Sequence, residues 1–258
     1  MALFLVKNST IKNRKYYTLF AFLFWLIVWF FLSLAVGEEM LLPSPLKTLS
    51  SLANNIKSTE FWFSILTSLK NIAFSLFISF VFSSLFAFLA NNYFFVEALL
   101  SPIVKTVRSV PVASIIILIL LWIKSKKLSL VISFLVTFPL LYTSILSGLK
   151  NTSTELLEMA SSYNVGLKKR IRYIYLPGLF PFLKNGISNA VGLAWKSSIA
   201  AEVIALPKNT LGSMLYESKI YLLSSDLFAL TLTIILLSIC FEKLSIFLLG
   251  KLEARIMR

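Results

Sequence analysis

Residues 155–177 read ELLEMASSYNVGLKKRIRYIYLP, a polar and basic stretch that lies between two long apolar runs. Just before it, Thr152-Ser153-Thr154-Glu155 predicts a capping box, in which Thr152 caps a helix and Glu155 reaches back from the third helical position. Leu156 and Met159 follow at helical spacing on one face. The first part of the stretch is therefore predicted to be a short helix.

The second part of the stretch predicts a turn and another helix. Asn164 and Gly166 are residue types that tolerate positive φ, so they indicate the turn. Residues 167–175 predict a second short helix with basic residues at its start. We expect it to end at Leu176-Pro177, because proline disfavours the helical conformation in the residue before it.

Outward from this loop the chain is strongly apolar. Of its 258 residues 58% are hydrophobic and 14% are charged, whereas an average soluble domain has about 25% charged residues. A single globular core cannot hide that much apolar surface. We therefore predict an all-α, polytopic membrane protein with about six transmembrane helices. The apolar runs lie at 19–36, 71–95, 99–123, 128–149, 184–206 and 226–250.

The distribution of basic residues predicts the orientation. Basic residues precede the first apolar run, as they do in a signal peptide, but the bulky aromatic residues of this run favour a retained membrane anchor. With both termini in the cytoplasm, 14 Lys and Arg fall inside and 7 fall outside, as the positive-inside rule favours. The sequence KSKK at 124–127 falls outside, and the rule leaves it unexplained.

Several kinds of chemistry are disfavoured by the residue counts. The chain has no His and a single cysteine, Cys240, so it lacks the residues of histidine-based triads and zinc sites. We therefore expect no catalytic site and no bound metal. The net charge of +14 is spread among apolar runs, which argues against nucleic-acid binding.

The loop resembles the "EAA" loop of binding-protein-dependent ABC transporter permeases. Glu158-Met159-Ala160 and Leu176-Pro177 fall in the register of that motif, and Asn164 stands where it has glycine. The resemblance extends over residues 41–248. Further matching segments are LLPSP at 41–45, RSVP at 108–111, AWK at 194–196 and AAE at 200–202, the last two being similar to the nitrate, sulfonate, taurine and bicarbonate branch.

The resemblance implies a type I ABC importer permease fold, similar to that of methionine importers, in the inner membrane. It implies a permease homodimer or pseudo-dimer, an ATPase subunit that the loop contacts, and an extracytoplasmic binding protein. The chain has no GxxxxGK[ST] sequence, so ATP hydrolysis is expected on the separate subunit and no cofactor on this chain. The implied coupling residues are Glu155, Glu158, Ala160, Asn164, Gly166, Leu176 and Pro177.

The chain is accordingly divided into three parts. Residues 1–58 would hold the cytoplasmic tail, the first span and an external segment. Residues 59–248 would form the transporter core, including the coupling loop 151–177. Residues 249–258 would be a cytoplasmic tail.

Three residues are candidates for the translocation pathway: Lys196, Glu202 and Pro111. Charges within spans are costly and usually face the bundle interior or water. Lys196 either pairs with a carboxylate of a second subunit or attracts an anionic substrate such as a sulfonate. Lys196 and Glu202 are six residues apart, so they lie on different faces of one helix.

Two other functions stay open on the residues alone. An ion-coupled secondary carrier would require paired acidic groups near the middle of the membrane, and the only candidate that we identify within a span is Glu202. A non-transporting membrane anchor would not require the register of the loop motif.

Overall fold

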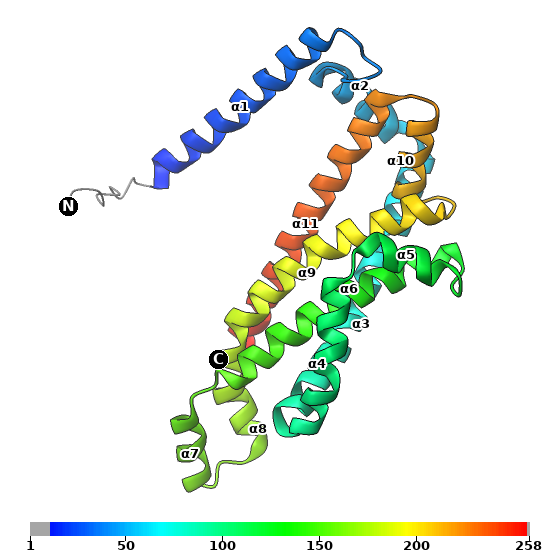
Figure 1. The fold of residues 1–258 in the computed structure, drawn as a ribbon. Coiled ribbons are helices and arrows are strands. Elements are labelled where there is room, and N and C mark those ends of the chain that lie inside the picture. Colours follow the sequence, from blue (N-terminus) through cyan, green and yellow to red (C-terminus); the bar gives the residue numbers. More distant parts are fainter. Residues whose placement is uncertain (1–10, 257–258) are drawn as a thin grey trace, which may run out of the picture.

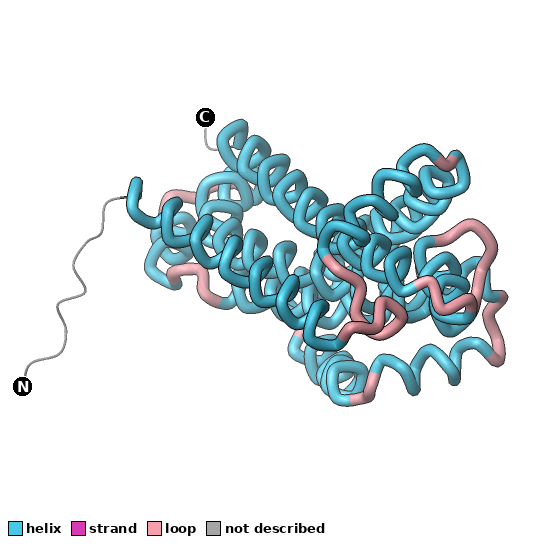
Figure 2. The backbone as a smooth tube through the Cα atoms, turned by 90° about the horizontal axis from the view of Figure 1, so that it is seen from above, coloured by secondary structure: helices cyan, strands magenta, loops and turns pink. Residues whose placement is uncertain are grey.

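The computed structural model describes residues 11–256, and within that range every regular element is helical (Figures 1 and 2). This confirms the all-α prediction. Lys7 and Arg258, which the topology prediction counts, lie outside the described residues. The helices are α1 (Ile11–Val36), α2 (Pro45–Lys57), α3 (Thr59–Asn92), α4 (Phe94–Ser109), α5 (Val112–Leu120), α6 (Ser125–Lys150), α7 (Thr154–Ser162), α8 (Leu167–Arg170), α9 (Leu176–Ala205), α10 (Leu211–Ile220) and α11 (Ser224–Ile256), with a π-helical turn η1 (Ile171–Tyr175) before α9.

Among the described helices, α1, α3, α6 and α11 are long and apolar enough to cross a membrane. The pair α4 and α5 is a fifth candidate if it is counted as one span. The remaining expected span corresponds to α9, an unbroken helix of 30 residues that carries Lys184, Lys196 and Glu202. Because these charges interrupt its apolar sequence, the passage of α9 through the membrane stays a prediction.

The third apolar run does not form the single helix expected over 99–123. α4 and α5 are separated by a short break, and their axes differ by 103°. Val110 within the break is extended, with φ −79° and ψ 134°. The reason is Pro111, which disfavours the helical conformation of the residue before it.

Helix α1 diverges from the bundle and returns to it only near α2 (Figure 1). None of its apolar window is buried. Its contact with the rest of the chain includes Trp29, whose Nε1 donates to the carbonyl of Pro43 at 3.1 Å and whose ring stacks on Phe228. The exposed apolar surface of α1 is suited to lipid or to another membrane subunit.

Helices α3 and α6 pack through a ladder of hydroxyl groups. Ser75 Oγ donates to Ser133 Oγ at 2.6 Å, and Ser79 Oγ lies 2.7 Å from Thr137 Oγ1. Small residues allow membrane helices to approach closely, and their hydroxyls join the helices by hydrogen bonds. The fully buried serines of this face of α3 are Ser64, Ser68, Ser75, Ser79 and Ser83.

Helix α9 runs through the bundle from α7 and α8 at one end to α10 at the other (Figure 1). It lies close to α6 at Gly186, where an added Cβ would stand 2.7 Å from Ser144 Cβ. The start of α9 is joined to the end of α11, because Lys184 Nζ lies 2.5 Å from Glu253 Oε2. Nearby, Arg172 Nε donates to the carbonyl of Ile256 at 3.0 Å.

Candidate functional site

The loop between α6 and α9 folds as the predicted pair of short helices, but its cap differs from the prediction. Ser153, and not Thr152, caps α7, and its Oγ accepts from the amide of Leu156 at 3.3 Å. Thr152 is buried instead. Both residue types can cap a helix, so the sequence leaves the choice to tertiary packing. Glu155 lies in the first turn of α7, where the helix dipole favours an acidic side chain.

The turn after α7 rests on Asn164. Its φ is +52°, and the amide of Val165 then donates back to the carbonyl of Ala160 at 2.8 Å. Asn164 therefore adopts the positive φ that its residue type was expected to tolerate. Gly166 does not share that conformation, since its φ is −62° and it precedes α8 as an extended residue.

The second helix does not end at Leu176-Pro177 as expected. α8 passes into η1, and η1 passes directly into α9. In the π-helical turn the amide of Leu176 donates to the carbonyl of Ile171, five residues back. This wider turn changes the backbone spacing just before Pro177, which then takes a place in the first turn of α9, where proline is tolerated.

Arg170 joins the two short helices, a role that the sequence pattern does not indicate. Its Nε donates to the carbonyl of Val165 at 2.7 Å, and its two terminal nitrogens donate to the carbonyl of Ala160 and to Ser161 Oγ, each at 3.2 Å. The carbonyls at the end of a helix lack partners within the helix. Arg170 therefore closes the end of α7 and fixes α8 against it.

The predicted coupling residues differ in exposure. Ala160 is buried against the rest of the hairpin, whereas Glu155, Glu158, Asn164 and Gly166 are exposed. Leu176 and Pro177 are half-buried at the start of α9. Between α7 and α8 lies a groove of about 400 Å³, lined by Leu156, Met159, Ala160, Tyr163, Val165, Lys169, Tyr173 and Ile174.

The exposed side chains of this groove are mostly apolar. Met159, Tyr163 and Tyr173 are each more than half exposed. Exposed apolar residues beside charged ones are typical of a protein contact surface. The hairpin therefore presents an exposed and mostly apolar surface outside the helical bundle.

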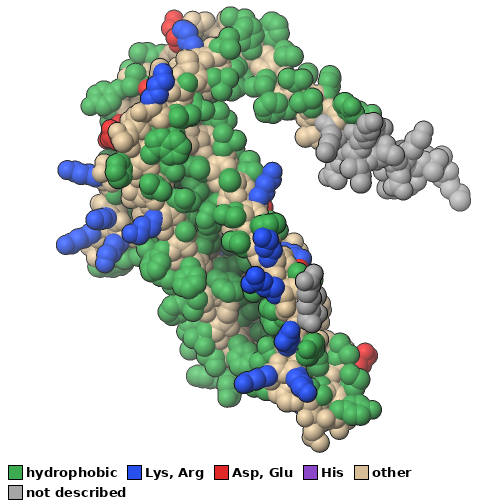
Figure 3. All heavy atoms as spheres, turned by 180° about the vertical axis from the view of Figure 1, so that it is seen from behind, with side chains coloured by type: hydrophobic (Ala, Val, Ile, Leu, Met, Phe, Trp, Pro, Cys, Tyr) green, Lys and Arg blue, Asp and Glu red, His purple; other side chains and the backbone are tan. Residues whose placement is uncertain are grey.

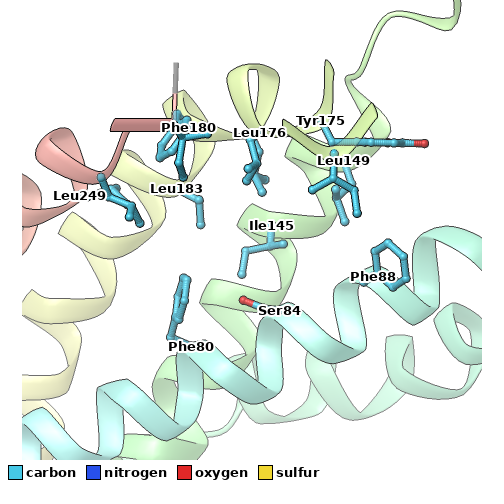
Figure 4. A pocket seen from close by; sticks show the side chains of 14 residues that line it. Phe80, Ser84, Phe88, Ile145, Leu149, Tyr175, Leu176, Phe180, Leu183 and Leu249 are labelled. Carbon is cyan, nitrogen blue, oxygen red and sulfur yellow. The ribbon is translucent and has the colours of Figure 1, made fainter. Parts of the chain in front are cut away.

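An apolar cavity of about 260 Å³ lies where the hairpin joins the bundle (Figure 4). Tyr175 and Leu176 line it from the hairpin side, and Phe80 and Phe88 line it from α3. Protein interiors are normally close-packed. This cavity therefore leaves space beside the base of the hairpin.

The structure does not bring the three predicted pathway residues together. Lys196 is exposed on α9, and Pro111 is exposed at the break between α4 and α5. Glu202 is fully buried. The neighbouring Trp195 is also buried within the chain, at 1% exposure, so it packs inside rather than against lipid.

Glu202 connects three helices inside the chain. Its Oε2 accepts from Ser68 Oγ of α3 at 2.8 Å and from the amide of Gly212 in α10 at 3.1 Å. An added Cβ on Gly212 would lie 2.3 Å from Glu202 Cβ, so only glycine permits this approach. These contacts fasten α10 to α9, and a pathway role for Glu202 stays a prediction.

A second cavity, of about 880 Å³, lies at the end of α9 opposite the hairpin. Four lysines line it: Lys70, Lys126, Lys127 and Lys208. Figure 3 shows blue side chains gathered on this side of the molecule, apart from those near the hairpin. Lys70 and Lys208 join the KSKK stretch only through the fold, so the sequence alone does not reveal this cluster. In the described part of the chain, no group of three His, Cys, Asp or Glu side chains could hold a metal ion.

Comparison with known proteins supports the resemblance of the loop. A family model described as "Binding-protein-dependent transport system inner membrane component" matches residues 79–258, which is more than half of the chain.

Two similar proteins come from Escherichia coli. The aliphatic sulfonates transport permease protein SsuC is 34% identical over 112 residues, which is 42% of each chain. The alignment therefore spans less than half of SsuC. The taurine transport system permease protein TauC is 24% identical over 74% of this chain and 71% of its own length.

A solved structure has the same fold. It is the crystal structure of a bacterial ABC transporter involved in the import of the acidic polysaccharide alginate. The TM-score is 0.60 at 15% identity, and the match covers 96% of this chain and 98% of that one. The expected importer-permease fold is confirmed.

Proposed function

Because the chain belongs to the family of binding-protein-dependent transport system inner membrane components, we propose that it is the permease subunit of an ATP-driven ABC importer for a small anionic solute. The names of the similar proteins support a sulfonate as the solute class. The observation that carries the proposal is the exposed hairpin α7–α8, which lies within the matched residues and projects from the bundle (Figure 1).

The permease acts together with partners. A separate ATPase subunit hydrolyses ATP, and this chain has no enzymatic activity and holds no cofactor. A binding protein delivers the solute to the opposite face, and the permease works as a homodimer in the inner membrane. The exposed Lys196 supports the dimer, because a lysine near the middle of a span requires water or a partner carboxylate.

The hairpin couples ATP hydrolysis to transport. α7 presents Glu158 and Met159 at its surface, and the Arg170 contacts hold α7 in a fixed orientation. Because α7 is held in this way, a displacement of the ATPase that moves α7 is transmitted through α8 and η1 to α9. The ion-coupled carrier is less well supported, since Glu202 is held by Ser68 and Gly212 inside the chain.

Glu158→Leu tests the coupling role. We expect the variant to insert normally. Copurification with the ATPase or coupled transport should fall at least tenfold, because a few residues carry most of the binding energy of a protein interface. Glu217→Leu is the matched control, since Glu217 is an exposed glutamate on α10, away from the hairpin. Normal ATPase binding and normal transport by Glu158→Leu would contradict the proposal.

Orientation has its own test. We expect both termini and the hairpin to be cytoplasmic. Cys240, the natural cysteine, is exposed, so it is first replaced by serine. In that background Gly166→Cys should react only from the cytoplasmic side and Lys57→Cys only from the outside. Reaction of Gly166→Cys with an impermeant reagent from outside would overturn the topology.

A further inference from the structure

The described structure brings together four lysines that are far apart in the sequence. Lys70 comes from α3, Lys126 and Lys127 come from the start of α6, and Lys208 comes from the segment after α9. They line one cavity of about 880 Å³. This volume is in the range of pockets that bind small molecules.

Among the described residues, the lysines of this cavity have no partners of opposite charge. None of the residues that line it is Asp or Glu. In the described part of the chain, the ion pairs join Lys47, Lys150 and Lys184 to glutamates, and the lysines of the cavity take part in none. A cavity lined by one sign of charge concentrates ions of the other sign.

The remaining polar groups of the cavity are neutral. Asn71 lies beside Lys70, and its Nδ2 donates to Ser129 Oγ at 3.2 Å. Thr67, Asn209 and Thr210 add further neutral side chains. The cavity thus offers several ammonium donors beside neutral polar and apolar side chains. Ammonium groups form strong, charge-assisted hydrogen bonds with an oxyanion.

The position of these charges is unusual. Lys126 and Lys127 belong to the stretch that the positive-inside rule leaves unexplained, because it lies on the proposed outer side. Basic residues on that side do not help to orient the helices. A ligand at the outer mouth of the permease would account for them.

We propose that this cavity binds a small organic oxyanion without a compensating amine, such as an alkanesulfonate, at the outer mouth of the translocation pathway. The proposal rests on the proposed importer function and narrows its substrate class. The cavity has four ammonium groups and no lining carboxylate. The ammonium group of a zwitterion such as taurine would therefore be repelled.

The test measures direct binding to the assembled complex. The permease is purified with its ATPase in nanodiscs of phosphatidylcholine, and the binding of ethanesulfonate and of taurine is titrated without the binding protein. We expect the wild type to bind ethanesulfonate more tightly than taurine. Lys126→Gln combined with Lys127→Gln should raise the Kd for ethanesulfonate about tenfold or more, because the double variant removes two charged hydrogen-bond donors to the sulfonate. Lys70→Gln and Lys208→Gln should each raise it by a smaller factor.

Two controls make the result specific. Lys219→Gln removes an exposed lysine of α10 that does not line the cavity, and it should leave the Kd unchanged. Copurification of the ATPase with each variant, at the wild-type ratio, shows that assembly is intact.

Several outcomes would overturn the inference. One is an unchanged Kd in the double variant, and another is an absence of ethanesulfonate binding by the wild type. A Lys→Gln effect that appears only in nanodiscs containing phosphatidylglycerol would assign the cavity to a lipid headgroup. If the Lys→Gln variants lose affinity only for the binding protein, titrated separately, the cavity is instead a basic docking surface for an acidic patch of that protein. If the wild-type complex does not assemble with an ATPase at all, the proposed function fails, which is distinguishable from failure of the cavity alone.

Discussion

Basic residues gather at both ends of α9, but the two clusters differ in what their side chains contact. At the hairpin end, Arg170 and Arg172 donate hydrogen bonds to carbonyls of the same chain. At the opposite end, the lysines of the cavity form no ion pair within the described residues. A count of charges registers both clusters only as basic residues on one side of the membrane or the other. Only the contacts distinguish charges that hold the fold from charges that are available to a ligand.

Gly212→Ala should cause the largest loss of stability, because it disturbs the buried contact between Gly212 and Glu202 at the end of α9 that carries the lysine cavity. The added Cβ would lie 2.3 Å from Glu202 Cβ and 2.7 Å from the backbone nitrogen of Val203. Backbone atoms cannot move aside cheaply, so we expect a loss of about 1–3 kcal/mol or more in stability. Thermal unfolding in detergent measures this loss.

Gly192→Ala is the matched control for that variant. Gly192 lies in α9, and an added Cβ there meets nothing within 4 Å. It should leave the unfolding temperature unchanged or slightly raised, since alanine favours helix. Equal effects of the two substitutions would show that the approach of α10 to Glu202 does not hold this end together.

Arg170→Ala should have the next largest effect, at the hairpin end. It removes the donors to Val165, Ala160 and Ser161. Arg170 is only half-buried and water can replace it, so we expect a local loss of about 1 kcal/mol in the stability of the hairpin. We expect faster hydrogen exchange over residues 154–170 and a fall in coupled transport. Lys168→Ala, in the same helix, should change neither. Unchanged exchange in Arg170→Ala would mean that the hairpin does not depend on this arginine.

Neutralising the ion pair between Lys184 and Glu253 should have the smallest effect. Both side chains are partly exposed, at 39% and 22%, and such pairs contribute about 0–1 kcal/mol. A double-mutant cycle with Lys184→Gln and Glu253→Gln, read by thermal unfolding, should give a coupling energy in that range. A much larger value would place this pair among the charges that hold the fold.

Much of the fold could be predicted from local sequence. The apolar runs correspond to described helices, and the hairpin follows from Asn164 and the capping residues around Ser153. The bend between α4 and α5 differs from the expected single span, because the apolar run continues across Pro111 while the helix does not. The π-helical turn before Pro177 was missed because its hydrogen bonds depend on how α8 meets α9.

The site was less predictable, because its main contacts join distant parts of the chain. Ser68 and Gly212 meet at Glu202 only through the packing of α3 and α10 on α9. The lysine cavity likewise requires α3, α6 and residues 206–210 to converge. The spacing of the buried serines in α3 was visible in the sequence, but it indicates a packing face only once α6 is known to lie against it.

The π-helical turn η1 also determines the direction in which the hairpin points. One residue of an α-helix corresponds to a rotation of about 100° around the axis. A turn of five residues that is hydrogen-bonded over a longer interval can gain or lose a residue while the helices on either side persist. An insertion or deletion at 171–175 would therefore rotate the hairpin relative to the bundle. If the proposed function holds, this turn sets the angle at which the hairpin meets an ATPase, independently of the packing of the membrane helices.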